Sequence, residues 1–306
     1  MLNTENLTTF KKMKEDTSVP PIPIIGNGIL LDNTMLTIVG PPKIGKTFLI
    51  FDLAIAIATG TQFLGTEIRE RKSVLILSAE GGYFPNRDRV KHLSKEIGSD
   101  NLDNVAYIPS SGLDLEDDSD VMELIDLIKQ EGFQVLIIDP FIRVHHADEN
   151  SASGMSDVFS KIRQIMDETK VALILVHHTG KNEYNGARGS SVIASEYDSC
   201  LTLRETNSGV QAIFDMRHVE TPDNMNLMFN SKTLRFEILD SANINSDTKL
   251  VEELLTEPKS RPDIIKALRK DGLSKTPAYN LIKAMIESGK LEIVNDKLTL
   301  SEASKN

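Results

Sequence analysis

The sequence contains one cysteine, Cys200, and no apolar run of the roughly 20 residues that a membrane-spanning helix needs. A single cysteine excludes a disulfide within the chain and fits a reducing compartment. The first residues, MLNTENLTTFKKMKED, lack the apolar segment of a secretory signal peptide. These absences predict a cytoplasmic protein that does not bind a membrane.

Positive charge is also in short supply. Lysine and arginine number 34 against 45 aspartates and glutamates, which gives a formal net charge of -11. This balance argues against a protein that coats nucleic acid with its whole surface, but it leaves room for a locally basic channel. The acidity belongs to the part before Thr248, because the remaining residues hold 11 lysines and arginines against 9 acidic residues.

The sequence does contain a phosphate-binding motif. Residues 40–47 read GPPKIGKT, which matches G-x-x-x-x-G-K-[ST], and they lie between the apolar run 35–39 and a helix-forming stretch from Phe48 to Ala58. In this arrangement the loop amides and the helix N-terminus hold polyphosphate, while the lysine reaches the β- and γ-phosphates and the threonine hydroxyl binds Mg2+. The predicted nucleotide-contacting residues are Gly40, Pro41, Pro42, Lys43, Ile44, Gly45, Lys46, Thr47 and Phe48.

Two further apolar runs end in carboxylates. Residues 73–79 lead into Glu80, which would orient the water that attacks the γ-phosphate, although a merely solvated glutamate at a strand exit is the alternative. The run 133–138 ends in Asp139, as in the Walker B pattern, where the carboxylate holds Mg2+ through water. Pro140 follows in place of the glutamate that one large class of ring ATPases keeps there, so the catalytic glutamate must come from elsewhere and Glu80 is favoured.

The run 171–176 predicts another buried strand, and it ends in His177 and His178. Successive strand residues face opposite sides, so these two histidines cannot readily hold one metal ion. A metal site that adds His145 and His146 is disfavoured, because no cysteine or carboxylate spacing supports it. His178 is instead the candidate contact to the γ-phosphate.

Two loops and a group of short strands complete the larger part of the chain. Residues 141–156 read as a long polar loop before a helix over 157–169, and 185–191 form a glycine-hinged loop with one exposed cation, Arg188. Short strands are expected at 198–204, 210–216, 226–230 and 233–239. Arg217 would leave the second of these strands toward solvent.

The coarse pattern divides the chain into four parts. Residues 1–19 predict a flexible arm, 20–240 an α/β domain with a mostly parallel sheet flanked by helices, 241–248 a polar linker, and 249–302 a winged helix-turn-helix. The exposed face of its recognition helix would carry Lys275, Thr276, Tyr279, Asn280 and Lys283. DNA and protein both remain open as its ligand, since small winged domains of near-neutral charge bind either.

Five segments in this order and spacing, GPPKIGKT, LILSAEGG, VLIIDP, ILVHHTGK and GARGSS, resemble the RecA-like ATPases of the RepA type. These are the hexameric plasmid and phage replicative helicases, with KaiC and RecA as more distant relatives. The similarity covers about residues 20–240. It implies a parallel RecA-like core, a homo-hexameric ring, and ATP with Mg2+ bound between neighbouring subunits.

The resemblance also implies residue roles. It assigns phosphate and Mg2+ binding to Lys46 and Thr47, catalysis to Glu80, Mg2+ binding to Asp139 and γ-phosphate sensing to His178. In such rings an arginine from the next subunit completes the site, and Arg217 matches that position best. Asp215 stands two residues before it, where relatives often carry a lysine.

The resulting hypothesis is an ATP-driven motor on single-stranded DNA. The loops after Asp139 and around Arg188 would face the central channel, where Phe141 and Tyr184 are the only aromatic residues placed for base stacking. The winged unit would bind duplex DNA or a replication protein. The alternatives are a KaiC- or recombinase-like regulatory ATPase that does not translocate, and a DNA-binding regulator whose oligomeric state ATP controls.

Overall fold

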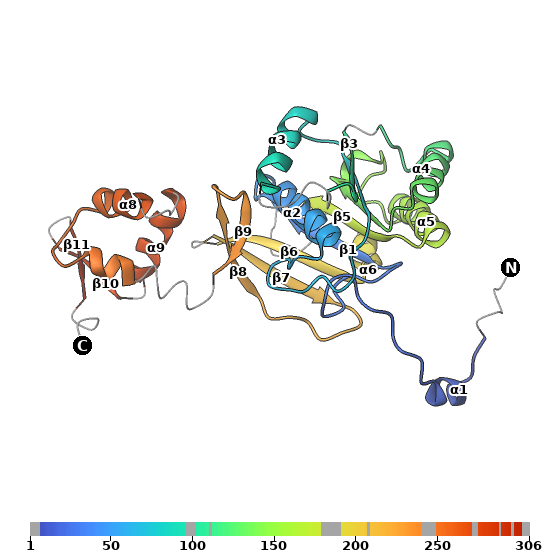
Figure 1. Ribbon diagram of the computed structural model, residues 1–306, viewed down its shortest axis with the longest axis horizontal. Helices are drawn as coiled ribbons and strands as arrows, with labels where there is room; N and C mark the ends of the chain where they lie inside the picture. Colours follow the sequence, from blue (N-terminus) through green and yellow to red (C-terminus); the bar gives the residue numbers. More distant parts are fainter. Residues whose placement is uncertain are drawn as a thin grey trace.

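The computed structural model describes residues 7–95, 102–109, 112–178, 191–206, 209–239, 249–270, 275–287, 289–294 and 297–301. In these ranges the chain forms one nine-stranded sheet with flanking helices and, toward its C-terminus, a small helical unit with a two-stranded sheet (Figure 1). No helix within them combines the length and the apolar character that crossing a bilayer requires.

The nine-stranded sheet has the order β3-β2-β4-β5-β1-β6-β7-β8-β9. Its strands are β1 Met35–Gly40, β2 Val74–Ser78, β3 Val105–Pro109, β4 Val135–Asp139, β5 Ala172–His178, β6 Ser199–Thr206, β7 Gly209–Met216, β8 Met225–Asn230 and β9 Arg235–Ile238. Pairing is parallel from β3 through β6 and antiparallel from β6 through β9. The predicted α/β class with a mostly parallel sheet is therefore confirmed.

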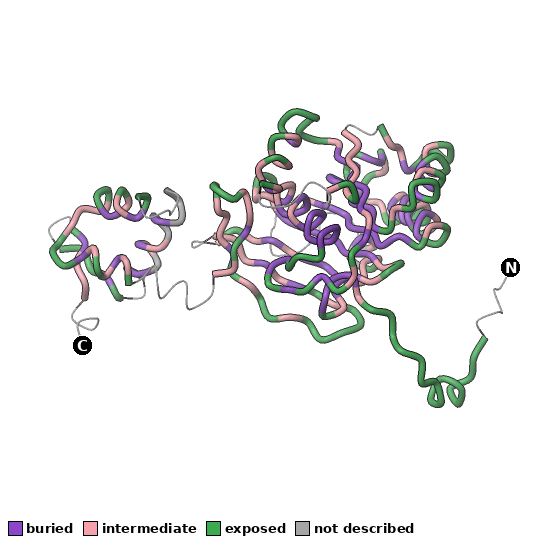
Figure 2. Tube along the Cα trace, in the orientation of Figure 1, coloured by how far each residue is buried: buried purple, intermediate pink, exposed green. Residues whose placement is uncertain are grey.

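Helices cover both faces of the parallel strands. They are α2 Lys46–Thr59, α3 Tyr83–Leu93, α4 Asp118–Glu131, α5 Ala152–Thr169 and α6 Ser191–Glu196. Successive strand residues enter different cores: Ile76 packs in a cluster with α2, whereas Leu75 packs in a cluster with α4 and α5. Coverage on both faces explains why the parallel strands read as continuous apolar runs and are buried throughout the centre of the sheet (Figure 2).

A helix in the N-terminal arm and the start of α5 differ from the sequence prediction. The arm contains a short helix, α1 Phe10–Glu15, which Thr9 caps and which buries none of its residues (Figure 2). Helix α3 begins at Tyr83 and includes Pro85, which is tolerated in a first turn whose N–H groups have no partner inside the helix. Helix α5 begins at Ala152, five residues before the prediction, where Ser151 Oγ accepts a hydrogen bond from Gly154 N at 3.3 Å.

The predicted polar loop 141–156 is correspondingly shorter and only partly exposed. It opens with a 3-10 turn, η2 Phe141–Arg143, and it ends at Ser151. Four of its side chains are buried, namely Phe141, Val144, His145 and Glu149. This segment therefore belongs in part to the core beside α5.

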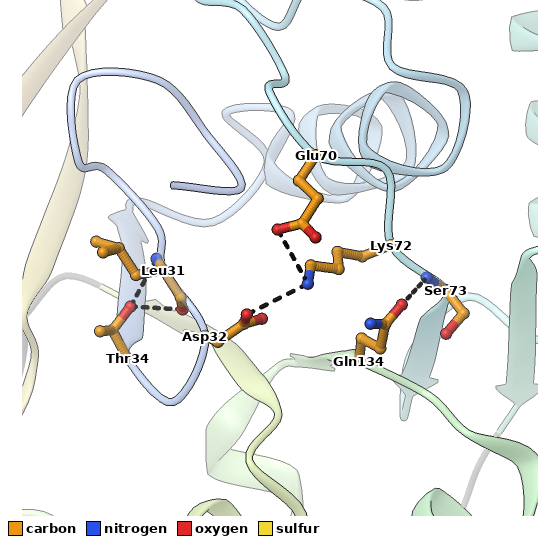
Figure 3. A network of polar contacts seen from close by, with 7 residues as sticks. All are labelled: Leu31, Asp32, Thr34, Glu70, Lys72, Ser73 and Gln134. Atoms are coloured by element: carbon orange, nitrogen blue, oxygen red, sulfur yellow. Dashed lines mark hydrogen bonds and ion pairs between the residues drawn. The ribbon is translucent and has the colours of Figure 1, made fainter. Parts of the chain in front are cut away.

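A buried ion-pair cluster lies at the edge of the sheet where the parallel strands begin (Figure 3). Lys72, just before β2, places its Nζ 3.2 Å from Asp32 Oδ2 and 3.1 Å from Glu70 Oε2. The Lys72 side chain is 5% exposed, whereas both carboxylates remain about half exposed. The lysine thus has its charge balanced and the carboxylates keep their hydration.

The C-terminal unit has a core of its own. It consists of a helical stretch at 249–254, helices α8 Arg261–Lys270 and α9 Lys275–Glu287, and the hairpin β10 Leu291–Val294 with β11 Lys297–Leu300. Its buried residues are Val251, Leu255, Ile264, Leu268, Ala278, Ile282, Met285, Leu291 and Leu298. The predicted linker 241–248, and the side chains of Lys275, Thr276 and Asn280, lie outside the part described.

Candidate nucleotide site

Strand register brings the predicted site residues together at the carboxyl ends of the parallel strands. β1 pairs with β5 so that Gly40 is opposite His178, and β2 pairs with β4 so that Ser78 is opposite Asp139. The carboxyl ends of these four parallel strands therefore meet along a single edge, which is where open α/β sheets bind their ligands. Glu80, just after β2, follows at the same edge.

The loop between β1 and α2 has the backbone that a phosphate-binding turn requires. Lys43 and Gly45 have φ values of 68° and 103°, and Gly45 directly precedes the first residue of α2. A side chain at Gly45 would also place its Cβ 2.8 Å from the Phe236 ring. Glycine is needed there for both reasons, and it leaves the N-terminus of α2 without a side-chain cap and open to an anion.

Lys46 is folded over its own loop. Its Nζ donates to the carbonyl oxygens of Gly40 at 2.7 Å and Pro41 at 2.9 Å, and it lies 3.2 Å from His178 Nδ1. Burial lowers the pKa of Lys46 to about 8, against the opposing attraction of Asp139 and Glu80. A negative phosphate group would offset this desolvation and raise the pKa of the lysine again.

Asp139 is the second ionisable group of the site whose charged form is disfavoured by burial. Its Oδ2 accepts a hydrogen bond from Thr47 Oγ1 at 3.0 Å. Burial raises the pKa of Asp139 to about 6; the Thr47 hydrogen bond opposes the shift and the charge of Glu80 adds to it. A hydroxyl beside a carboxylate whose charge is poorly solvated fits Mg2+, which takes oxygen ligands and is held by few protein groups when phosphate supplies the others.

Glu80 is anchored through its main chain, and its carboxylate is half exposed. Its carbonyl oxygen accepts hydrogen bonds from Ser78 Oγ at 3.1 Å and Asn86 Nδ2 at 3.3 Å. Its side chain is 49% exposed, and Oε1 lies 3.8 Å from Arg143 Nε of η2. The carboxylate is therefore accessible to water at the edge of the crevice and close enough to influence Lys46 and Asp139.

The four histidines do not converge. His178 meets Lys46, His177 and His145 are buried beside Phe141, and His146 is exposed near Asp114. The opposite orientation of His177 and His178 agrees with the strand geometry expected from the sequence. In the described ranges no group of three or more histidine, cysteine or acidic side chains is arranged to hold a metal ion.

Helix α3 supplies residues that the sequence did not single out. Arg89 places its guanidinium over the Phe48 ring, 4.6 Å from the centroid, and donates to Asn86 Oδ1 at 2.7 Å. Its charge also opposes the rise in the pKa of Asp139. The spacing of Asn86 and Arg89, which places them on one helix face, was the only available signal, and it does not reveal a contact with α2.

Arg217 lies at the opposite side of the sheet from the site, level with the ends at which the parallel strands begin. Because β7 runs antiparallel to β6, its last residue Met216 pairs with Ser199, which is level with the start of β1. Arg217 N donates to Asp198 O at 3.0 Å, and the guanidinium contacts Ser195 O. The structure thus brings Lys46, Asp139, Glu80 and His178 together and leaves Arg217 away from the crevice of its own chain. Arg188 and Tyr184 lie outside the described residues.

Comparison with known families agrees with this geometry. A family model described as an AAA domain matches residues 3–184, more than half of the 306-residue chain. The match includes the phosphate loop, Glu80, Asp139 and His178, and it ends before β6. A nucleotide crevice at the carboxyl edge of a parallel sheet is what an ATPase of the RecA-like kind requires. The chain therefore belongs to the AAA domain family, as a RecA-like P-loop ATPase.

Proposed function

We propose that this ATPase is a RepA-type replicative helicase that hydrolyses ATP between neighbouring subunits of a ring and moves along single-stranded DNA. The observation that carries the proposal is the position of Arg217 at the edge opposite its own crevice. A residue so placed cannot complete its own site, but it is exposed and can complete the site of a second copy. A head-to-tail contact of this kind closes into a ring when the rotation between neighbouring subunits closes, and it forms a filament when the rotation does not.

The chain's own residues have distinct tasks in hydrolysis. Bound Mg2+ and ATP supply the reactive phosphate and the charge that neutralises it. Lys46 would exchange its two carbonyl partners for phosphate oxygens, and Thr47 with Asp139 would hold the metal. Glu80 orients the attacking water. His178, which already touches Lys46, contacts the same phosphate and loses that contact after hydrolysis.

One observation favours a second candidate, a KaiC- or recombinase-like ATPase that switches without translocating. Phe141, expected in the channel as a base-stacking residue, is 1% exposed and packs against Phe159 in the core. The expectation that it stacks on bases was wrong, because the segment after Asp139 folds inward. With one aromatic candidate removed, contact with DNA would depend on cations such as the exposed Arg143.

We further propose that the C-terminal unit is a winged helix-turn-helix that binds duplex DNA or a replication protein. Two helices followed by a hairpin around a separate core support this assignment. Tyr279, expected on the exposed face of α9, is 44% exposed and lies beneath Arg261, whose guanidinium is 5.0 Å from the ring centroid. Together they present a cation over an aromatic ring, which suits a phosphate or an acidic partner.

The test is the rate of ATP hydrolysis with and without single-stranded DNA, together with the mass in solution when ATP is bound. A hexamer whose rate rises several-fold with DNA supports the motor. A DNA-insensitive rate would replace it with the switch. Glu80→Gln is the matched control: it should lower turnover by roughly 10²–10⁴-fold while ATP binding and assembly persist.

A further inference from the structure

Three ionisable side chains are buried directly behind the nucleotide site. His177 of β5 is 2% exposed, and His145 and Glu149 of the segment 140–151 are buried with it. They lie among the apolar residues that join α4, α5 and the sheet. Burying polar and charged groups in such a core costs free energy unless they are paired, so their presence calls for an explanation beyond packing.

The three side chains form one compact cluster. Glu149 Oε1 lies 3.6 Å from His177 Nδ1, so the carboxylate faces the imidazole across the space between the two segments. The Phe141 ring packs against both histidines, with centroid distances of 4.6 Å to His145 and 6.0 Å to His177. The contact between Glu149 and His177 therefore fastens the segment after Asp139 to the end of β5.

This end of β5 is also the part that reaches the crevice. His177 and His178 are consecutive strand residues, and they face opposite sides of the sheet. His178 lies 3.2 Å from Lys46 Nζ, while His177 holds the buried carboxylate. Because the two histidines are consecutive in β5, a contact that holds His177 in place also restricts the main chain of His178. For the same reason, a displacement of His178 would move His177 relative to Glu149.

We propose that Glu149 and His177 are positioning residues that hold His178 against Lys46 and link the γ-phosphate contact to the segment 140–151. The proposal rests on the proposed site of ATP hydrolysis. The linked segment carries Arg143, whose Nε is 3.8 Å from Glu80. Loss of the γ-phosphate at His178 is thus relayed through the buried pair to the loop and to the surroundings of the attacking water.

The test compares the affinities of the full chain for Mg2+-ATPγS and Mg2+-ADP by calorimetry, a readout that does not require hydrolysis. Glu149→Gln keeps the shape of the side chain and removes its charge. It should reduce the preference for ATPγS over ADP about tenfold and leave ADP affinity within twofold. Glu116→Gln is the matched control, because the Glu116 carboxylate contacts the same segment from the surface, accepting from His146 N at 2.5 Å, and its affinities should not change.

A second variant separates positioning from packing. Glu149→Leu combined with His177→Leu replaces the buried pair by apolar groups of similar size, a change that is often neutral or stabilising for folding. We expect a folded protein that has lost the preference for ATPγS. If this variant keeps the wild-type preference, the pair is only structural and the proposal is wrong. Failure of the wild-type chain to hydrolyse ATP, with the preference intact, would instead contradict the proposed function.

Discussion

Two lysines at opposite ends of the parallel strands are buried to the same extent, but they contact different groups. Lys46 and Lys72 are each 6% exposed. Lys72 lies between the carboxylates of Asp32 and Glu70 at the edge where the strands begin (Figure 3). Lys46, at the edge where they end, meets carbonyl oxygens and an imidazole, and burial lowers its pKa to about 8.

The difference distinguishes a lysine that holds the fold together from one that is kept for a ligand. Carboxylates balance the charge of Lys72 within the chain. At the other edge the buried carboxylate Asp139 is directed at Thr47, and its pKa is raised to about 6. Burial thus disfavours the charged forms of both Lys46 and Asp139, and Mg2+ with polyphosphate would stabilise both charges.

The largest effect is expected at Lys46. Lys46→Ala should lower ATP hydrolysis by roughly 10²–10³-fold, because it removes a cation aimed at the reacting phosphate. The melting temperature should change little, since the lysine is disfavoured where it lies. Turnover assays and thermal unfolding on the same preparation measure the two effects. Hydrolysis at the wild-type rate would show that the crevice is not the site.

Asp139→Asn tests whether the buried carboxylate of the site, like Lys46, lowers the stability of the protein without its ligand. A pKa raised to about 6 means that the folded chain binds a proton more tightly than the unfolded chain, so wild-type stability falls as pH rises from about 4 to 6. The variant should lack this dependence and gain about 3 kcal/mol at pH 7 without Mg2+. Denaturant unfolding across this pH range is the measurement. A variant less stable than wild type at pH 7 would contradict the assignment.

At Lys72 the expected pattern is reversed. Lys72→Met should lower the free energy of unfolding by about 1–2 kcal/mol, because two carboxylates lose a buried partner but remain half hydrated. The turnover number should stay within twofold. Lys129→Met is the control: it removes a surface ion pair with Glu168, 3.0 Å long, and should cost less than about 0.5 kcal/mol. Loss of turnover in Lys72→Met would contradict the view that Lys72 only stabilises the fold.

The smallest effect is expected at Arg143. Its exposed contact with Glu80 is long, at 3.8 Å, and weakly stabilising. Arg143→Gln should raise DNA-independent hydrolysis by no more than about twofold, since it frees the carboxylate from a competing cation. Arg87→Gln, which removes the same charge from an exposed pair with Asp88, serves as the reference. A rate that falls instead would show that Arg143 assists the reaction.

The parallel strands and the phosphate loop could be predicted from the sequence because their signals are local. Apolar runs mark β1, β2, β4 and β5, and each ends within two residues of the predicted position. The inward fold of the segment after Asp139 could not be predicted in this way. Phe141 packs against Phe159 of α5 and His177 of β5, and Glu149 lies beside His177, so the burial of this segment depends on contacts with residues that are not its neighbours in sequence.

The sequence by itself determined which residue types stand at strand ends: a lysine and a threonine after β1, a glutamate after β2, an aspartate at the end of β4 and two histidines at the end of β5. Tertiary structure alone decided their neighbours. The strand order places Gly40 beside His178 and Ser78 beside Asp139, and the antiparallel pairing of β7 with β6 places Arg217 at the opposite ends of the strands. Pairing between distant strands is a property of the whole sheet, and no short stretch of sequence encodes it.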